Sequence, residues 1–262
     1  MDEKTRVENG ISRNVLKWIA IVTIAIGHFF LYTLTTLNFL QLLPKPGRRI
    51  LCYICFVGPP IFMFFISEGF RYTSSKKRYG MRLLLFAVIT QVASAITTNS
   101  GCGFDFDVFL FSWNVFFTLF LGFLDLCILT SKKHWAVKLL GVLATLILSY
   151  VMKTEWWVFG QLIIIAFYYL RERKVWKMVV TTLLFYLAFF LSDFDPEGSF
   201  ELAPWSKQMP YILSFGVIGI VLVSLFYKGK NGASNKFLKY FFYVFYPLHL
   251  VLIQLVNWML RA

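Results

Sequence analysis

Charged side chains are scarce in this chain of 262 residues. They account for 15% of it, whereas 58% of the residues are hydrophobic and the mean hydropathy is +0.68. A soluble domain is about a quarter charged. Polar residues gather between apolar blocks of about 18–24 residues, the length that crosses a hydrocarbon core as a helix. The composition excludes a soluble globular protein and predicts one integral-membrane domain, 1–262, because no polar segment is long enough for a second domain.

Cysteine is also rare, with four in the chain. Cys52 and Cys55 have the spacing of half a zinc site, but no second pair or histidine accompanies them, so we expect no metal. Cys52 and Cys102 are predicted near the same membrane face and would suit a disulfide in an oxidising compartment. The favoured alternative is that the thiols pack as small apolar side chains.

Acidic residues are half as numerous as basic ones, 13 against 26, which gives a net charge of +13. The basic residues form no stripe and no known motif, so we do not expect nucleic-acid binding. Membrane topology explains them instead, because cytoplasmic loops are enriched in Lys and Arg.

Hydropathy predicts an all-α bundle of about nine transmembrane spans. They lie at 14–35, 50–70, 82–98, 109–130, 136–152, 155–170, 175–192, 210–227 and 237–260. With this count, 20 of the 26 basic residues fall on one side. We therefore expect the N-terminus in the cytoplasm, the C-terminus outside, and a multi-pass location in a bacterial cytoplasmic membrane, in contact with its lipids. No signal-peptide cleavage site follows the first apolar block, so we interpret it as an uncleaved span.

Histidine is the rarest ionisable residue, and two of the three lie deep inside predicted spans. His28 lies roughly 16 Å beyond Lys17, and His249 roughly 15 Å beyond Lys239, at about 1.5 Å per helical residue. An ionisable group in hydrocarbon is costly, so both should face the interior and find a partner. Two interpretations stay open: a neutral histidine that hydrogen-bonds across helices, or a pair that shares an aqueous cavity and moves protons.

Other polar side chains are expected inside or at the edge of the membrane. Glu68 and Arg71 have the i, i+3 spacing of a helix-end ion pair, or form a site at the cytoplasmic mouth. Arg82 opens the third span, and Gln91 lies about 13 Å further in.

The fourth predicted span carries three polar residues on one helix face. Asn114, Thr118 and Asp125 follow i, i+4, i+11 spacing, and Asp125 is expected to point at the bundle interior. Thr118 has the simpler alternative of bonding its own i−4 carbonyl.

The basic loop 71–82 also has two interpretations. It serves topology and contact with anionic headgroups, or it forms a rim that binds phosphates.

Five segments in order along nearly the whole chain carry a family resemblance. They are LKWIAIVTIAIGH (16–28), PIFMFFISEGFRYT (60–73), KRYGMRLLLFAVITQ (77–91), NVFFTLFLGF (114–123) and LKYFFYVFYPLHL (238–250). Together they resemble the TraX family, integral membrane proteins named for the N-terminal acetylation of pilin. That family is related to a larger group of membrane acyltransferases, the acyltransferase-3 group.

The resemblance implies an acyl-CoA co-substrate, such as acetyl-CoA, and an amine or hydroxyl acceptor on a peptide, sugar or lipid. It assigns the family's first-span and last-span histidines to His28 and His249. The family's other motif residues correspond to Glu68, Arg82, Asn114 and Thr118. One departure stands beside His28: the family usually has Asp directly before this histidine, and this chain has Gly27.

The leading hypothesis is a membrane-embedded acyltransferase. The CoA phosphates would bind near Arg71, Lys76, Lys77, Arg78 and Arg82. One of His28 and His249 would take the acceptor's proton, and the other would hydrogen-bond the developing oxyanion. Asn114, Gln91 and Tyr246 are candidates for positioning the substrates. The alternatives are a small-solute transporter with the histidines as a proton relay, and a non-catalytic accessory subunit.

Overall fold

The structure is a computed structural model that describes residues 10–33, 43–97, 104–192, 209–229 and 236–261. The α-helices are α2 (Arg13–Thr33), α3 (Lys45–Tyr53), α4 (Gly58–Tyr72), α5 (Lys76–Thr97), α6 (Phe106–Phe111), α7 (Val115–Leu129), α8 (Trp135–Val151), α9 (Trp157–Tyr169), α10 (Lys174–Ser192), α11 (Met209–Val221) and α12 (Lys236–Arg261). A 3-10 turn, η2 (Ile54–Val57), joins α3 to α4, and a π-helical turn, η3 (Leu222–Phe226), follows α11. Within the described ranges there is no β-sheet, so the all-α prediction is confirmed.

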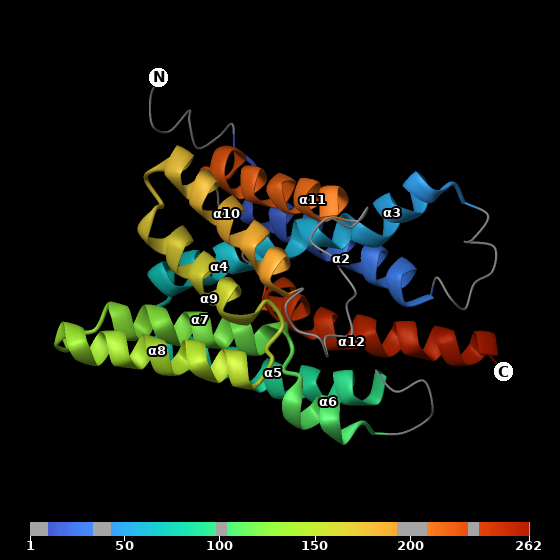
Figure 1. The fold of residues 1–262 in the computed structure, drawn as a ribbon, viewed down its shortest axis with the longest axis horizontal. Coiled ribbons are helices and arrows are strands. Elements are labelled where there is room, and N and C mark those ends of the chain that lie inside the picture. Colours follow the sequence, from blue (N-terminus) through green and yellow to red (C-terminus); the bar gives the residue numbers. More distant parts are fainter. Residues whose placement is uncertain (1–9, 34–42, 98–103, 193–208, 230–235, 262) are drawn as a thin grey trace.

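The apolar helices match the predicted spans. Six helical stretches of the described chain are long and apolar enough to cross a membrane, and three shorter apolar helices accompany them: Trp135–Val151, Trp157–Tyr169 and Pro210–Phe226. In Figure 1 the α7–α8 and α9–α10 turns, both rich in basic residues, lie at the same end of the molecule, opposite α3 and the C-terminus. This arrangement agrees with the predicted alternation of sides, while the sidedness itself stays a prediction.

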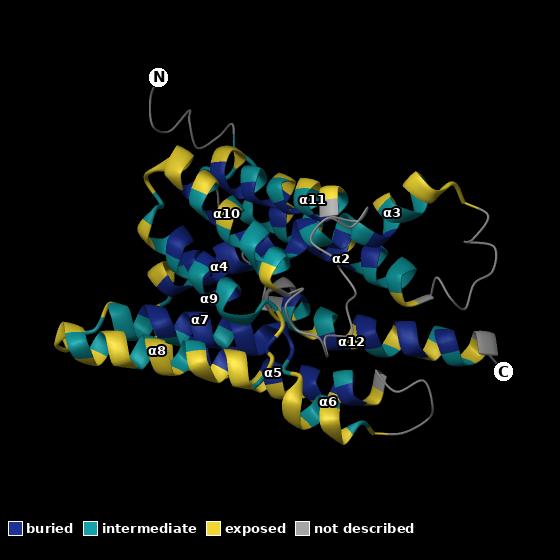
Figure 2. Ribbon diagram, in the orientation of Figure 1, coloured by how far each residue is buried: buried dark blue, intermediate teal, exposed yellow. Residues whose placement is uncertain are grey.

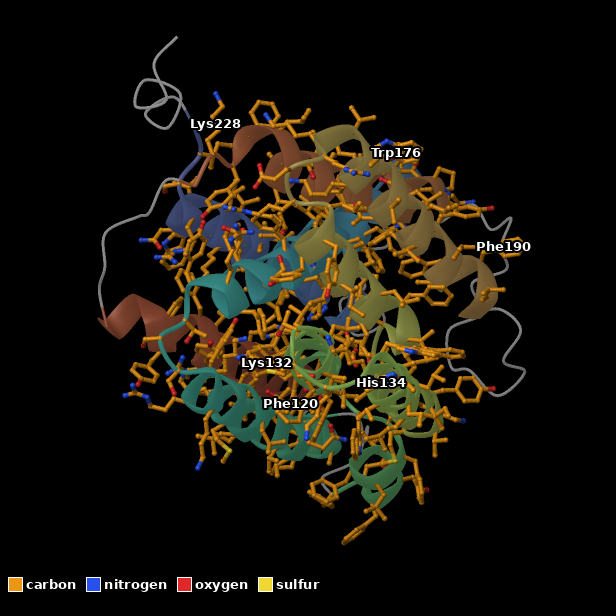
Figure 3. The ribbon with its side chains drawn as sticks, turned by 90° about the vertical axis from the view of Figure 1, so that its left-hand side faces the viewer. Phe120, Lys132, His134, Trp176, Phe190 and Lys228 are labelled. Atoms are coloured by element: carbon orange, nitrogen blue, oxygen red, sulfur yellow. The ribbon has the colours of Figure 1, made fainter. Side chains whose placement is uncertain are left out.

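The outward faces of the peripheral helices are apolar. Figure 2 shows exposed residues along the outer surface of α8, and they include Leu140, Ile147 and Val151. Viewed along the long axis in Figure 3, Trp176 and Phe190 of α10 lie at the rim of the molecule. Exposed apolar surface of this extent is expected of helices that face lipid.

The core is built around α4, which packs against α2, α7, α9 and α11. Its side chains Ile61, Met63 and Phe64 are almost fully buried. Glycines let the neighbouring helices approach closely: a Cβ at Gly160 of α9 would lie 2.5 Å from Cγ2 of Thr118 in α7. Small residues at helix crossings are typical of membrane bundles, where close van der Waals packing drives association.

Two helix boundaries differ from the predictions in ways that affect the site. The fourth span, predicted as continuous over 109–130, breaks between α6 and α7, because Asn114 leaves the helix and caps α7 by accepting a hydrogen bond from Phe116 N at 2.9 Å. The third begins at Lys76 rather than at 82, so Arg82 lies within α5 and does not open it.

Candidate active site

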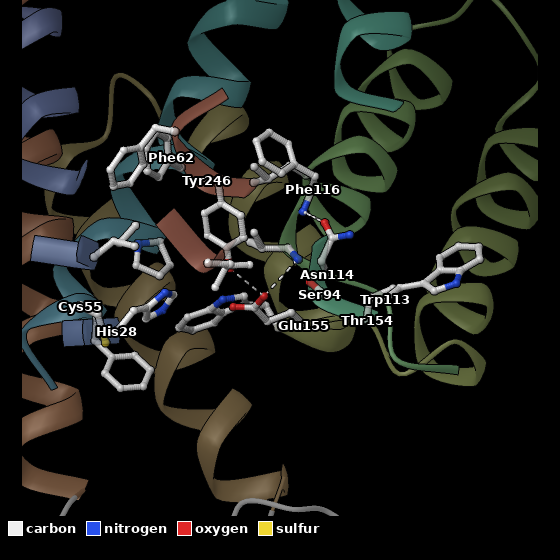
Figure 4. Close-up of a pocket in the computed structure, with 18 of the residues that line it drawn as sticks. His28, Cys55, Phe62, Ser94, Trp113, Asn114, Phe116, Thr154, Glu155 and Tyr246 are labelled. Atoms are coloured by element: carbon white, nitrogen blue, oxygen red, sulfur yellow. Dashed lines mark hydrogen bonds between the residues drawn. The ribbon is translucent and has the colours of Figure 1, made fainter. Parts of the chain in front are cut away.

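A cavity of about 760 Å³ lies within the bundle. Its walls come from α2, η2, α4, α5, α7, the α8–α9 turn, α10 and α12, and Figure 4 shows part of this lining. The volume is within the range of about 300–1,000 Å³ that is usual for ligand sites. Aromatic side chains dominate the wall, and a few polar groups interrupt it.

Helices α2 and α12 run parallel along the cavity, and three contacts set their register. Lys17 Nζ lies 4.9 Å from the centre of the Phe242 ring. Further along, His28 meets His249. Beyond them, Asn257 Nδ2 donates to the Tyr32 carbonyl at 3.3 Å. Residues of equal depth in the two helices are therefore neighbours.

The two histidines form a hydrogen-bonded pair. His28 Nδ1 and His249 Nε2 are 2.9 Å apart, and the rings stack with an interplanar angle of 22°. The depth argument from the sequence predicted their proximity. The structure distinguishes the two residues: His28 lines the cavity, whereas His249 lies behind it and is 6% exposed.

Hydrogen bonding fixes the tautomers of a neutral pair. His249 Nδ1 lies 3.1 Å from the Phe245 carbonyl, which only accepts, so Nδ1 carries the proton. His249 Nε2 then accepts from His28 Nδ1–H, and the lone pair of His28 remains on Nε2. No hydrogen bond from the described part of the chain reaches that Nε2. His28 thus presents a basic nitrogen at the cavity, oriented by His249.

Close helix packing explains the glycine that stands where the family has aspartate. A Cβ on Gly27 would lie 2.5 Å from Cys55 Cβ and 2.7 Å from Cys55 N, because η2 crosses α2 at this point. Contacts that short are essentially never seen for a Cβ atom, so an aspartate at position 27 would have to push η2 away from α2. Another group must supply any negative charge at the site.

Gly27→Asp is therefore expected to destabilise the protein instead of restoring a family feature. Overpacking of this kind costs about 1–3 kcal/mol, and a buried carboxylate adds to the cost. The thermal midpoint in detergent should fall, and Gly47→Asp is a matched control because a Cβ on Gly47 meets nothing within 4 Å. A Gly27→Asp protein as stable as the wild type would show that η2 does not press on α2.

Glu155 supplies a carboxylate to the cavity, and the sequence analysis missed it. It lies in the α8–α9 turn, which Figure 1 shows near the middle of the long axis and not at either end. Glu155 Oε2 accepts hydrogen bonds from Tyr246 Oη at 3.2 Å and from Val115 N at 3.1 Å. One sequence feature could have pointed to it. Glu155 lies where two unusually short apolar blocks meet, 136–152 and 155–170, and blocks this short need not both cross the membrane.

The predicted residues Gln91, Asn114 and Thr118 hold the α6–α7 break and the α8–α9 turn in place. Gln91 Oε1 accepts from Asn114 Nδ2 at 2.7 Å, and Gln91 Nε2 donates to the Ser112 carbonyl at 2.9 Å. Thr118 Oγ1 donates to the Glu155 carbonyl, so the simpler alternative of an i−4 bond was wrong. Of the three, Asn114 borders the cavity, and Tyr246 borders it as well.

Glu68 forms an ion pair, but the predicted partner was wrong. Arg171 Nε donates to Glu68 Oε1 at 2.9 Å, from the α9–α10 turn, and Arg171 Nη2 donates to Tyr72 Oη at 2.8 Å. Glu68 is 5% exposed and Arg71 is exposed. A partner 103 residues away competes successfully because it reaches the buried carboxylate, whereas Arg71 points outward.

This ion pair predicts a coupling that a double-mutant cycle will measure. Glu68→Gln and Arg171→Gln should each lower the free energy of unfolding by about 1–3 kcal/mol, because the first leaves the half-buried Arg171 guanidinium without its partner and the second leaves the buried Glu68 carboxylate without its partner. The double variant should lose less than the sum of the two. The matched cycle with Glu68→Gln and Arg71→Gln should be additive, and a coupling there with none at Arg171 would contradict the pairing.

The basic residues predicted to hold phosphates lie outside the cavity wall. Arg71, Lys76, Lys77 and Arg78 are exposed at the junction of α4 and α5. Arg82 lies over the ring of Tyr79, with its guanidinium 5.6 Å from the ring centre, and Tyr79 itself borders the cavity. Among the described basic residues of the predicted cytoplasmic side, Lys17 of α2 lines the cavity.

Two further predictions concern residues away from the cavity. Asp125 is fully buried and accepts from Thr145 Oγ1 of α8, so it does point into the bundle, between α7 and α8. Cys52 and Cys55 are buried free thiols, and Cys55 Sγ donates to the Cys52 carbonyl at 3.3 Å. Cys102 lies outside the described residues.

Comparison with known proteins gives one family. A family model described as TraX protein matches residues 12–257. The chain is 30% identical over 261 residues to a protein of Dichelobacter nodosus named "Probable fimbrial assembly protein FimC, serogroup H1", covering 93% of this chain and 97% of the relative. No solved structure matches.

Proposed function

The chain belongs to the TraX family, and from this premise we propose that it is a membrane-embedded acyltransferase. The proposed donor is cytoplasmic acyl-CoA, most simply acetyl-CoA, and the proposed acceptor is an amine or hydroxyl of a peptide, sugar or lipid. The fimbrial-assembly name of its relative favours a peptide among these acceptors.

The observation that carries the proposal is the histidine pair at the wall of the cavity. A general base must reach the acceptor's proton and must hold a free lone pair at the right place. His28 Nε2 meets the second condition because His28 Nδ1 is the nitrogen that bonds to His249, and the ring lines a cavity of about 760 Å³, large enough for a thioester arm and an acceptor group. In this assignment His28 is the base and His249 is a positioning residue.

The proposed reaction needs no group beyond the two substrates. His28 Nε2 takes the proton of the acceptor amine or hydroxyl as the acceptor atom bonds to the thioester carbonyl carbon. The carbon–sulfur bond then breaks, and the leaving CoA thiolate takes the proton that His28 holds. The products are the acylated acceptor and CoA thiol, and the histidine returns to its neutral state.

The donor is proposed to enter from the end of the cavity that Lys17 borders. Lys17 belongs to the basic segment predicted on the cytoplasmic side, and an ammonium near the mouth attracts phosphate. Arg82 stands behind Tyr79 at the same end and adds positive charge. The exposed basic residues at the α4–α5 junction, Arg71, Lys76, Lys77 and Arg78, would attract the CoA phosphates from a greater distance.

Release of CoA thiol by the purified protein tests the proposal. We expect release from acetyl-CoA that depends on an added acceptor, screened as peptides, sugars and lipids, and a thermal stabilisation by CoA itself. A protein that binds no CoA, releases none with any acceptor class, and moves a small solute into vesicles would instead be a transporter.

A further inference from the structure

A single carboxylate faces the cavity from the wall that the α8–α9 turn provides. Glu155 is exposed, and it borders the cavity together with His28 and Tyr246. Figure 4 shows Glu155 and His28 reaching into this space from different elements. The catalytic steps proposed above make no use of it.

Glu155 is held in a fixed orientation. Two hydrogen bonds that described residues donate to its side chain, from Tyr246 Oη and Val115 N, end on Oε2, and the indole of Trp156 adds a further stabilising contact to the carboxylate. Its own carbonyl accepts from Thr118, which fixes the backbone of the turn from α7. Lys153 and Trp156 in the turn and Trp157, the first residue of α9, have positive φ, so this conformation is costly and is maintained by the surrounding packing.

We expect the Glu155 carboxylate to bind a cation. Glu155 forms no ion pair with any residue that the structure describes, and the wall around it is largely aromatic. A bound positive charge stabilises a carboxylate at such a wall, because the attraction between opposite charges is stronger beside apolar protein than in bulk water. An ammonium group also suits the aromatic rings nearby, through cation–π attraction.

We propose that Glu155 binds the ammonium group of the acceptor and so selects amines over hydroxyl acceptors. The inference rests on the proposed acyl transfer for its role in catalysis, but not for the binding itself. The bound ammonium must lose one proton to water before it attacks, and the remaining amine then reacts with the thioester as described for His28. Tyr246 connects the two parts of the site: its hydroxyl holds Glu155, and its ring packs 6.2 Å from that of His28.

The test compares two probes that differ in one group. One is a short apolar peptide with a free N-terminal amine, and the other is the same peptide with a hydroxyl in place of the amine. The variants are Glu155→Gln, which keeps an acceptor for Val115 N and Tyr246, and Glu155→Asp, which keeps the charge. Glu172→Gln is the matched control, because Glu172 is a glutamate 84% exposed in the α9–α10 turn.

Glu155→Gln should raise KM for the amine peptide about 10- to 100-fold, the usual loss for a hydrogen bond to a charged group. The KM for acetyl-CoA and the rate with the hydroxyl peptide should stay unchanged, and Glu155→Asp should recover part of the amine binding. Equal losses with both peptides would mean that Glu155 only holds the turn, and would overturn the proposal. No loss with either peptide would overturn it as well.

Binding without acyl-CoA separates this inference from the proposed function. Titration of the amine peptide, followed by the fluorescence of cavity tryptophans such as Trp156, should show binding to the wild type and about 10- to 100-fold weaker binding to Glu155→Gln. Binding of this kind in a protein that transfers no acetyl group would sustain the site and refute the enzyme. Acetyl transfer with equal peptide affinities in both proteins would sustain the enzyme and refute the site.

Discussion

His28→Ala is expected to lower kcat for acetyl transfer by about 10²- to 10⁴-fold, the contribution typical of a general base. The effect should fall on kcat because the imidazole acts on the proton that moves during the attack, while the cavity walls that bind both substrates remain. His28 lies in α2 with one ring nitrogen bonded to His249 and the other facing the cavity.

Two further variants test whether a loss of activity in His28→Ala comes from misfolding or from the loss of any histidine. His28→Gln keeps a donor for His249 Nε2 and fills most of the ring's volume, so it should fold like the wild type and remain inactive. His134→Ala is the matched control, since the third histidine caps α8 in an exposed turn and should leave kcat unchanged. Activity within twofold of wild type in a folded His28→Gln protein would remove His28 from the chemistry.

His249→Leu should lower kcat by about 10- to 100-fold, the loss usual when an orienting partner of a functional histidine is removed. Leucine cannot accept from His28 Nδ1–H, so the proton is free to move to Nε2, and the base then faces the cavity in the wrong tautomer. Substrate KM values should change little, because His249 lies behind the cavity wall.

The conservative variant separates positioning from simple packing. In His249→Gln the side-chain carbonyl can accept from His28 Nδ1–H while its amide donates to the Phe245 carbonyl, so most of kcat should return. A folded His249→Gln protein as slow as His249→Leu would show that His249 takes part in proton transfer itself. A His249→Leu protein with a larger kcat loss than His28→Ala would reverse the two roles.

The sequence was sufficient to predict the helical bundle and the meeting of the two histidines. Hydropathy predicts spans because burying a polar backbone in lipid leaves few alternatives to a helix. The last basic residue before each span marks the membrane surface, so the number of residues beyond it gives the depth of a side chain. By this measure His28 and His249 lie at nearly the same depth. Two residues at one depth in parallel helices become neighbours once those helices pack together, as α2 and α12 do.

The remaining parts of the site depend on contacts that no local pattern encodes. The hydropathy profile placed Glu155 at the first residue of the predicted span 155–170 without singling it out, and such a profile does not reveal that the turn before this span ends inside the bundle. Arg171 is separated from Glu68 by 103 residues, so helix spacing favoured Arg71 instead. The α6–α7 break follows from the hydrogen bonds between Asn114 and Gln91 in α5, a tertiary interaction.

The family resemblance raised a question about Gly27 that only packing answers. A missing aspartate next to a candidate base suggests a weakened or lost activity when it is considered on the sequence alone. The close crossing of η2 over α2 shows that the position has no room for any side chain. The orienting role is instead available to His249, and a carboxylate enters the cavity from Glu155.

The most direct test of the account is the transfer of radiolabelled acetyl groups from acetyl-CoA to an amine acceptor by the purified protein. The wild type should transfer label, and folded His28→Gln protein, verified by an unchanged thermal shift with CoA, should transfer at least about 10²-fold less. Equal transfer by both proteins, or none by a wild type that binds CoA and the amine peptide, would contradict it.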